Sequence, residues 1–597
     1  MQNLALAAVA DLGVYRIRGN FVTNGTAMTA GSRLDWLVRE QGEPRASMNR
    51  PFNKILIANR GEIAGRIARA AGALGMETVG VYAPVDSLSL HTRYVGEARE
   101  LSGSADPVGA YLDIEALLAI AVASGCDALH PGYGFLSENE TLARRCAESG
   151  LTFIGPSPEV LSLFGDKVRA RDFARTHGVP TIPGSPEALA DPAAAMRAAT
   201  EAGYPVMLKA AAGGGGRGMR LVRDEAEMAD AFARCASEAE AAFGNGRLFL
   251  EKCIERPRHI EVQILGDSVG KVVHLFERDC SIQLRHQKVV EIAPAPGLDE
   301  EVRERLLGDA VKMAAAAGYQ NAGTVEFLVS PETSEHWFIE CNPRIQVEHT
   351  ITEQVMGVDL VETQFRLAAG TSLDELGLAD QDRVGVPRGF AIQARVVAQG
   401  VGGITAYKEP TGAGVRVDGN GYGGYQPPPQ FDPLLAKVIA SGTDYASALA
   451  RTRQALAEFQ VGGLPTNISQ LDRILGQPEV QQGDARTSLL AEVPSLAQPP
   501  AGAVAKGAAL ALLEQQALGV GNAAHAGAAV PMALPDLPVA DGQLGIEAPM
   551  AGSVLSVAAA PGARVAAGET LLVISAMKME SVIAAPCAGT LADLLPL

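Results

Sequence analysis

The sequence predicts a chain of several domains, α/β and α+β over most of its length and all-β at its C-terminal end. Three observations predict this class. The stretch Lys54–Tyr82 alternates strand, helix and strand at the spacing of a βαβ unit on a parallel sheet. A second region places strands that end in charged residues around a run of four glycines. The C-terminal end repeats the phrase A-P-x-A-G on both sides of a lysine, and such repetition indicates two similar halves.

Composition narrows the function classes. A chain of 597 residues is too long for one domain. The net charge of −18 and the pI near 5.1 argue against non-specific nucleic-acid binding. The seven cysteines are dispersed without a C-x-x-C pair, which is typical of free thiols in a reducing compartment, so we expect a cytoplasmic protein. No apolar run is long enough to span a membrane.

Residues 1–47 show little periodicity. The apolar patch Leu4–Ala10 lacks a preceding basic region, so a secretory signal is not expected, and the acidic residues of the segment fit a transit peptide poorly. A clear strand begins soon after Met48. We interpret residues 1–47 as a disordered or wrongly assigned extension, with a small docking segment as the alternative.

The first domain, about residues 48–160, opens with the strand Lys54–Ala58 and a turn into a helix. The Gly61 turn alone is a weak nucleotide signal, and an ordinary βα turn is the favoured interpretation of it. The loop His130–Asn139 combines glycines, a proline and an aromatic residue, which predicts a rigid, shaped connection. Its Tyr133 fits either a binding site or simple packing.

A glycine run follows the predicted buried strand Pro205–Ala210. Successive glycine N–H groups can wrap anionic oxygens, and Lys167 and Lys209 can supply charge to phosphates. The spacing matches neither the P-loop nor the dinucleotide fingerprint. A flexible linker is the alternative, although such linkers rarely follow a buried strand directly. The run consists of Gly213, Gly214, Gly215 and Gly216.

Charged residues in the next strands extend this anion site. Glu251, near the end of the strand Leu248–Lys252, can accept a hydrogen bond from an adenine or ribose donor. The stretch Glu277–Lys288 concentrates basic residues in an acidic protein, which indicates an anionic ligand.

Two apolar strands each carry a carboxylate and predict a metal site. Thr324–Val329 contains Glu326, and Trp337–Asn342 contains Glu340 and ends in Asn342. A carboxylate in an apolar strand is costly unless it is paired or metal-bound. These oxygens are hard ligands suited to Mg²⁺ (or Mn²⁺) on nucleotide phosphates. Strand-end carboxylates that face solvent are the alternative.

The repeat at the C-terminal end surrounds Lys578, which lies between two methionines after the apolar run Thr570–Ile574. A hairpin tip presents such a lysine outward. An ordinary surface lysine is the alternative, but the repeated phrases make modification the better interpretation. The segment resembles the biotin carboxyl carrier (biotinyl) domain, whose A-M-K-M lysine is biotinylated by a ligase. Lipoyl domains share the fold but typically carry D-K-A.

The phrases A-N-R-G-E-I-A, H-P-G-Y-G-F and N-P-R-I-Q-V-E-H, at 58–64, 130–135 and 342–349, resemble the biotin carboxylase family over about Lys54–Pro494. The resemblance implies a pre-ATP-grasp βαβ domain, an ATP-grasp domain at 161–365 with a glycine-rich lid at about 183–253, and a C-terminal lobe at 385–494. An Ala/Gly/Pro-rich linker at 495–543 then tethers an all-β biotinyl domain at 544–597.

The resemblance also implies roles for individual residues. Bicarbonate must lose a proton before it attacks the γ-phosphorus of ATP, so a carboxylate base beside an arginine is required. That base is Glu348, beside Arg344. Arg395 matches the arginine that stabilises charge on biotin, although an exposed strand arginine explains it on the strand alone. The other implied residues are Lys288 at the phosphates; Gln346, Val347 and Tyr133 for bicarbonate and biotin; Lys167, Lys209, the four glycines, Glu251, Lys252, His259, Gln283 and His286 for ATP; and Glu326, Glu340 and Asn342 for the metal.

Two features depart from the family pattern. The acidic phrase N-A-E-D-P is absent after Val397, which puts the local loop in doubt. The second half of the C-terminal repeat stops at Leu597, about two strands early if the repeat is symmetric. We therefore expect an incomplete biotinyl domain, from a polypeptide that continues or from a truncated one.

We predict a biotin carboxylase that uses ATP and bicarbonate to carboxylate biotin on its own carrier, as part of an acyl-CoA carboxylase of fatty acid metabolism. The alternatives are the same part of a two-subunit pyruvate carboxylase, favoured by the wording of His349–Glu353 and Val289–Pro294, another ATP-grasp ligase, or a non-catalytic scaffold. Expected partners are a carboxyltransferase subunit or downstream domain, a biotin protein ligase and further copies through the carboxylase domain, with neither nucleic acid nor membrane.

Overall fold

The structure is a computed structural model that describes residues 51–103, 106–185, 188–211, 219–497, 544–546, 553–576 and 579–592. The predictions for residues 1–47, the four glycines, the linker and Lys578 itself lie outside these residues. Within them, no helix has both the length and the apolar composition needed to cross a membrane.

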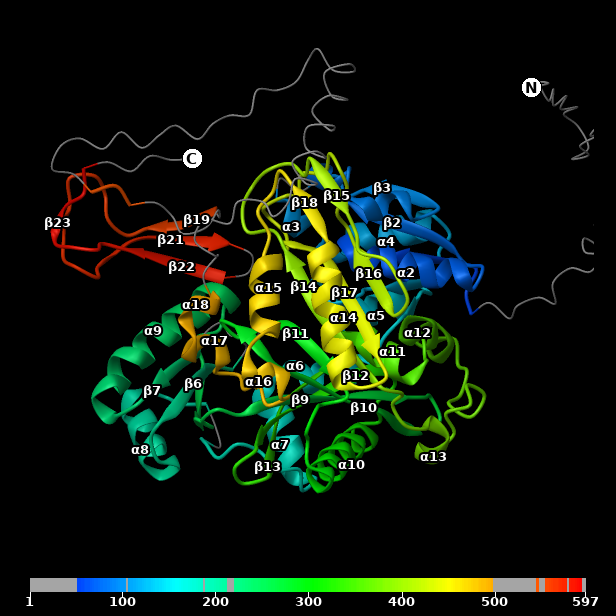
Figure 1. The fold of residues 1–597 in the computed structure, drawn as a ribbon, viewed down its shortest axis with the longest axis horizontal. Coiled ribbons are helices and arrows are strands. Elements are labelled where there is room, and N and C mark those ends of the chain that lie inside the picture. Colours follow the sequence, from blue (N-terminus) through cyan, green and yellow to red (C-terminus); the bar gives the residue numbers. More distant parts are fainter. Residues whose placement is uncertain are drawn as a thin grey trace, which may run out of the picture. The chain divides into compact units, whose positions relative to one another are not determined.

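A five-stranded parallel sheet forms the first part of the carboxylase region (Figure 1). The predicted βαβ unit is confirmed, since α2 (Gly61–Ala73) connects the neighbouring strands β1 and β2. Ile55, Leu56 and Ile57 of β1 are fully buried, as expected for a central parallel strand. The strand order is β3 (Glu97–Glu100), β2 (Glu77–Tyr82), β1 (Lys54–Ile57), β4 (Ala128–His130) and β5 (Thr152–Phe153).

The second sheet has eight antiparallel strands and holds most of the predicted site residues. It joins strands from the predicted ATP-grasp region to strands that come after residue 385, so the two regions share one sheet. The order is β13 (Glu335–Asn342), β12 (Asn321–Ser330), β9 (Arg258–Gly266), β10 (Val272–Leu284), β11 (Gln287–Ala293), β14 (Phe390–Val397), β17 (Leu434–Gly442) and β16 (Val415–Gly419).

Strand periodicity divides this sheet into a core face and a polar face. In β9, Ile260, Val262 and Ile264 belong to a hydrophobic core that also contains Leu306 and Met313 of α10 (Glu300–Ala316). The side chains that alternate with these three residues of β9 point to the other face of the sheet. They are His259, Glu261 and Gln263, all largely buried, and they therefore need polar partners.

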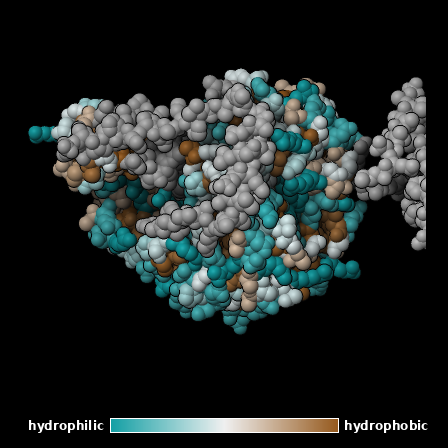
Figure 2. Space-filling view, turned by 45° about the horizontal axis from the view of Figure 1, so that its top comes forward, coloured by the Kyte–Doolittle hydropathy of each residue, from teal (hydrophilic) through white to brown (hydrophobic). Residues whose placement is uncertain are grey.

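Helices complete the carboxylase region. α14 (Tyr445–Glu458) packs on β14 and β17, where Leu449 and Leu456 meet Val396 and Val438 (Figure 1). The other helices near the sheets include α4 (Ile114–Ala123), α5 (Glu140–Glu148), α6 (Pro158–Gly165), α7 (Lys167–Thr176), α11 (His349–Met356), α12 (Leu360–Ala368) and α15 (Ile468–Leu475). Figure 2 shows a face on which hydrophilic residues predominate, in line with the high net charge.

A small antiparallel sheet contains the two strands that precede and follow the predicted glycine run in the sequence. Its order is β7 (Met219–Val222), β6 (Val206–Ala210) and β8 (Leu248–Lys252), and α8 (Pro192–Ala202) and α9 (Glu225–Phe243) pack against it. The predicted strands that end near Lys209 and Lys252 are thereby confirmed, and they are direct neighbours.

The C-terminal region is all-β, as predicted. One sheet has the order β19 (Ser553–Val557), β21 (Thr570–Ala576) and β22 (Met579–Ala584), and β20 (Arg564–Val565) pairs with β23 (Gly589–Thr590). Ala576 pairs with Met579, so the strands that flank Lys578 form the predicted hairpin. The predicted fold class is confirmed.

Candidate functional site

The centre of the site is Lys288 on β11, which three carboxylates surround. Its Nζ lies 2.5 Å from Oε2 of Glu261, 2.8 Å from Oε1 of Glu326 and 2.7 Å from Oε1 of Glu348. The carboxylates come from β9, β12 and the residue before α11, and all three are buried. The fold thus brings together residues that lie 27 to 60 positions apart in the chain.

Charge pairing controls the protonation of this group. Burial alone would raise the pKa of Glu348, but the charges of Lys288 and Arg395 outweigh burial and hold it well below its ordinary value. Burial would also raise the pKa of Glu326. The charges of Lys288 and His259 outweigh burial and hold this pKa well below its usual range. Both carboxylates are therefore ionised near neutral pH and able to accept a proton or bind a cation.

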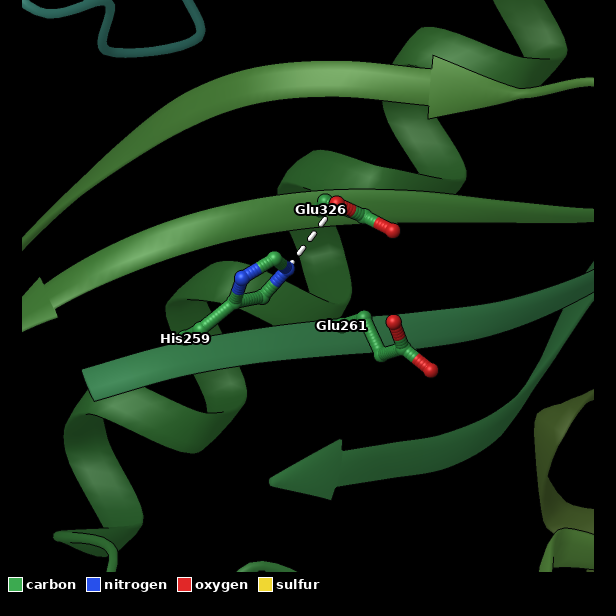
Figure 3. Close-up of side chains that lie close together, drawn as sticks. All are labelled: His259, Glu261 and Glu326. Atoms are coloured by element: carbon green, nitrogen blue, oxygen red, sulfur yellow. Dashed lines mark hydrogen bonds and ion pairs between the residues drawn. The ribbon is translucent and has the colours of Figure 1, made fainter. Parts of the chain in front are cut away.

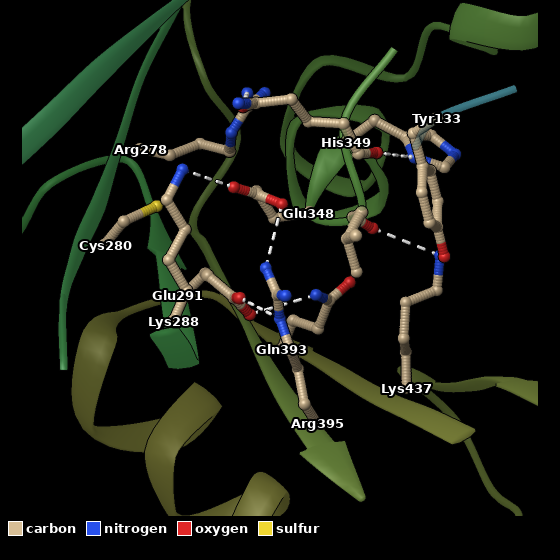
Figure 4. Close-up of polar contacts among 12 residues, drawn as sticks. Tyr133, Arg278, Cys280, Lys288, Glu291, Glu348, His349, Gln393, Arg395 and Lys437 are labelled. Carbon is tan, nitrogen blue, oxygen red and sulfur yellow. Dashed lines mark hydrogen bonds and ion pairs between the residues drawn. The ribbon is translucent and has the colours of Figure 1, made fainter. Parts of the chain in front are cut away.

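Arg395 of β14 holds Glu348 from the side opposite Lys288 (Figure 4). Its Nη2 lies 3.0 Å from Oε2 of Glu348, and its Nε lies 2.5 Å from Oε1 of Glu291. Gln393 donates a 2.9 Å hydrogen bond to the other oxygen of Glu291. Arg395 is thus a partly buried arginine paired with two carboxylates, and the interpretation as an exposed strand arginine is wrong.

The predicted metal ligands meet on neighbouring strands. Glu326 of β12 lies directly opposite Glu340 of β13, and Nδ2 of Asn342 lies 3.0 Å from Oε1 of Glu326. A bulge follows, because Phe327 lies opposite Phe338 and Ile339 has no partner in the register. Lys167 binds Glu340 at 2.5 Å, and its charge lowers the pKa of Glu340.

These oxygens fit a hard divalent cation. Two ionised carboxylates face each other across strands, and each also binds an ammonium group of a lysine, which shows that this position attracts positive charge. Figure 3 shows His259 and Glu261 on β9 with Glu326 on the neighbouring strand, where Nε2 of His259 lies 2.9 Å from Oε2 of Glu326. Ligand atoms of His259, Glu261 and Glu326 all lie within 4.8 Å of one another, so Glu326 is shared by two possible ligand sets.

Several predicted ATP contacts lie next to this centre or on the small sheet. Lys209 binds the carboxylate of Glu251, and Nε2 of Gln283 lies 2.9 Å from Nδ1 of His259. Lys252 instead donates to the carbonyl groups of Gly203 and Tyr204, at 2.7 and 3.1 Å. His286 lies in the β10–β11 turn with φ of +65°. Burial lowers its pKa, so the ring is neutral near pH 7.

The predicted bicarbonate and biotin residues approach from the loops. Nε of Arg344 lies 2.6 Å from Glu138, and Nη2 lies 2.9 Å from Oδ1 of Asn342. Gln346 donates to Oε1 of Glu326 at 2.9 Å. Tyr133 donates its hydroxyl to Glu62 of α2. The structure therefore places Arg344 and Gln346 beside Asn342 and Glu326, whereas the hydroxyl of Tyr133 contacts Glu62 of α2.

Sequence reasoning missed three residues of the site. Glu261 binds both Lys288 and the fully buried Arg278, and Glu291 binds Arg395. The alternation of His259, Glu261 and Gln263 in a strand otherwise made of isoleucine, valine and leucine was a usable signal. It carries the same desolvation cost that identified Glu326.

Known families match most of the chain. The family described as "Biotin carboxylase, N-terminal domain" matches residues 51–161, "Carbamoyl-phosphate synthase L chain, ATP binding domain" matches 166–376, and "Biotin carboxylase C-terminal domain" matches 393–492. The family described as "Biotin-requiring enzyme" matches 545–596. These matches follow one another in the order that the sequence analysis predicted.

The pyruvate carboxylase of Aspergillus niger is 48% identical over 457 residues, which cover 74% of this chain and 38% of that protein. The chain thus spans about two fifths of the length of the curated relatives it matches.

Solved structures agree with the fold. The biotin carboxylase domain dimer of Hydrogenobacter thermophilus 2-oxoglutarate carboxylase, in complex with MgADP, ADP and bicarbonate, has a TM-score of 0.72 at 43% identity, over 75% of this chain and 99% of that one. Rhizobium etli pyruvate carboxylase gives a TM-score of 0.72 at 43% identity, over 75% of this chain and 41% of that one. The chain therefore belongs to the biotin carboxylase family, with a domain of the biotin-requiring enzymes fused behind the carboxylase.

Proposed function

We propose that this chain carboxylates biotin attached to Lys578 of its own carrier domain, with ATP and bicarbonate as co-substrates. The observation that carries the proposal is the position of Glu348, a buried ionised carboxylate held between Lys288 and Arg395. In this role, Glu348 takes the proton of bicarbonate as the bicarbonate oxygen attacks the γ-phosphorus and ADP leaves. The cations around it offset the negative charge of both reactants.

The residues of β12 and β13 serve the nucleotide in this proposal. Glu326, Glu340 and Asn342 would hold Mg²⁺, which would offset the negative charge of the nucleotide phosphates. Lys167 and Lys209 contact the phosphates, and the glycine run covers them.

Arg395 and Tyr133 serve the biotin side. Arg395 faces Glu348 with one edge of its guanidinium, and its charge also acts on Tyr133. The carboxyphosphate formed from bicarbonate breaks down to CO₂ and phosphate, the phosphate takes the N–H proton of the ureido ring of biotin, and that nitrogen then attacks the CO₂. The carrier then delivers it to a carboxyltransferase, which is a separate subunit or a downstream domain.

The acceptor is proposed to be pyruvate. The sequence analysis preferred an acyl-CoA carboxylase, but the relatives reported above are named pyruvate carboxylases, and one solved neighbour is named a 2-oxoglutarate carboxylase. They favour a 2-oxo acid, as in the pyruvate carboxylase alternative. The further partners are a biotin protein ligase and a second copy of the carboxylase domain, and the compartment is the cytoplasm.

The decisive experiment measures ATP hydrolysis by the purified chain with bicarbonate, with and without free biotin. We expect turnover that biotin stimulates and that falls at least about a hundredfold in Glu348→Gln. ATP hydrolysis whose rate does not change with biotin and that yields carbamoyl phosphate would instead assign the chain to another ATP-grasp ligase. A biotinylated chain labelled from ¹⁴C-bicarbonate, mixed with a carboxyltransferase fraction of the native cells, should then lose label to pyruvate and not to acetyl-CoA or propionyl-CoA.

A further inference from the structure

Lys437 of β17 is a lysine whose side chain is completely buried. Burying an ammonium group is costly unless its charge and its protons find partners. Its Nζ lies 2.9 Å from Oε2 of Glu62 and 3.8 Å from Oδ2 of Asp418, and it donates a 3.1 Å hydrogen bond to the carbonyl oxygen of Val347. The activity described above uses neither Lys437 nor Glu62.

One of these contacts leads to Tyr133. Glu62 lies in the first turn of α2 and accepts the hydroxyl hydrogen bond of Tyr133, which comes from the loop after β4. Burial raises the pKa of Tyr133 well above its ordinary value, so the hydroxyl stays protonated and remains a donor. Figure 4 shows Lys437 and Tyr133 extending toward the same point from different segments. Lys437 and Glu62 therefore fix the hydroxyl end of Tyr133.

The other contact leads to Glu348. The carbonyl group of Val347 and the backbone nitrogen of Glu348 belong to one planar peptide unit. When Lys437 holds that carbonyl, it fixes the plane from which the Glu348 side chain departs. Lys288 and Arg395 hold the carboxylate end of the same side chain. Glu348 is thus held at its backbone and at its tip by different cations.

We propose that Lys437 is a positioning residue that sets, from the buried side, both the general base Glu348 and the biotin-side residue Tyr133. This inference rests on the proposed function. It predicts an effect on bicarbonate and biotin that ATP does not share. Among the described residues, the side chains assigned to ATP and metal contact other partners. Lys167 contacts Glu340, Lys209 contacts Glu251, and His259 contacts Glu326 and Gln283.

The alternative is that Lys437 only neutralises two buried carboxylates and stabilises the fold. Steady-state kinetics of Lys437→Met in the full chain separate the two roles. Positioning predicts that kcat/KM for bicarbonate and for free biotin falls by about ten- to a hundredfold, since small misplacements of reacting groups have effects of this size. The KM for ATP should stay within about twofold, well under the change expected for a lost contact.

A control variant, Arg303→Met, removes a cation 3.0 Å from the fully buried Glu277, which pairs with the core residue Val262 and not with Glu261 of the site. It should lower Tm and leave all three substrate constants unchanged. If Lys437→Met gives this same profile, or shifts the constants for ATP, bicarbonate and biotin equally, the positioning role is overturned.

Two isosteric substitutions keep the test independent of the folding of Lys437→Met. Glu62→Gln and Asp418→Asn each neutralise a buried carboxylate next to Lys437. Of these two carboxylates, only that of Glu62 accepts the hydrogen bond of the Tyr133 hydroxyl. Glu62→Gln should raise the KM for free biotin several-fold, whereas Asp418→Asn should not. Equal effects of the two substitutions contradict the inference. A wild-type chain without biotin-stimulated turnover overturns the proposed function as well, whereas an active wild type with unaffected variants overturns only the positioning role.

Discussion

The ammonium nitrogen of Lys288 lies 2.7 Å from Oε1 of Glu348, and the same nitrogen also contacts Glu261 and Glu326. One lysine thereby neutralises part of the charge of three buried carboxylates. The general base of the proposed reaction depends on this lysine for its ionised state, and so does Glu326, the proposed metal ligand.

Replacing Lys288 with methionine should destabilise the protein most near neutral pH. The pKa values of Glu326 and Glu348 lie below the ordinary 4.5, so their pairing with Lys288 stabilises the fold above that pH and is lost as the pH falls. Without the lysine, we expect a loss of about 3–5 kcal/mol at pH 7.5, because buried like charges then lack a partner. The loss should shrink below about pH 5 as the carboxylates protonate. Calorimetric Tm values at several pH values test this, and a difference from wild type that does not vary with pH would contradict it.

Glu326→Gln and Glu340→Gln should mainly weaken the binding of Mg²⁺ that supports ATP turnover. Each removes one anionic oxygen donor and keeps the shape of the side chain, so the Mg²⁺ concentration for half-maximal ATP turnover should rise by about ten- to a hundredfold. Titration of activity with Mg²⁺ and with Mn²⁺ measures this. Glu335→Gln, at the exposed start of β13, is the matched control and should leave the titration unchanged.

Glu291→Gln should change the pH dependence of stability in a definite direction. Burial raises the pKa of Glu291 to about 7, against the opposing charge of Arg395. Between pH 4.5 and 7 the folded state then binds more protons than the unfolded one, so this group costs stability as the pH rises. Glutamine cannot ionise, and the variant should gain on the order of 1–3 kcal/mol relative to wild type between pH 5 and pH 8. Urea unfolding at the two pH values measures the difference, and a gain at pH 5 instead would refute the assignment.

Lys578→Arg should separate the two halves of the chain. Arginine keeps the charge but offers no primary amine for amide formation with biotin. Avidin blotting after expression with a biotin ligase should therefore show no label. Turnover stimulated by free biotin should match wild type, because the carboxylase residues are untouched. Biotin label that persists in the variant would place the modification elsewhere.

The strands could be predicted well from the sequence because buried strands consist of apolar runs that turn residues delimit. Glu326 and Glu340 stood out because each interrupts such a run. The pairing of Lys288 with Glu348 could not be derived in the same way, since it depends on where the residue before α11 lies against the distant strand β11. Glu261 was missed because a polar residue at every second position resembles a solvent-facing strand, whereas this one faces a buried charged site. The contacts of Lys437 could not be predicted from the sequence either, since its partners come from three other segments of the chain.

The unpaired Ile339 has a consequence for how this site can vary. In a regular strand, Phe338 and Glu340 would point to the same side. The extra residue lets Phe338 enter the core beside Phe327 while Glu340 faces Glu326. If Ile339 were instead paired in a regular ladder, Phe338 and Glu340 would share one face, which would place either a phenylalanine beside Glu326 or a glutamate in the core. We therefore expect the backbone at position 339 to stay unpaired whichever side chain stands there, because the bulge keeps Phe338 and Glu340 on opposite faces.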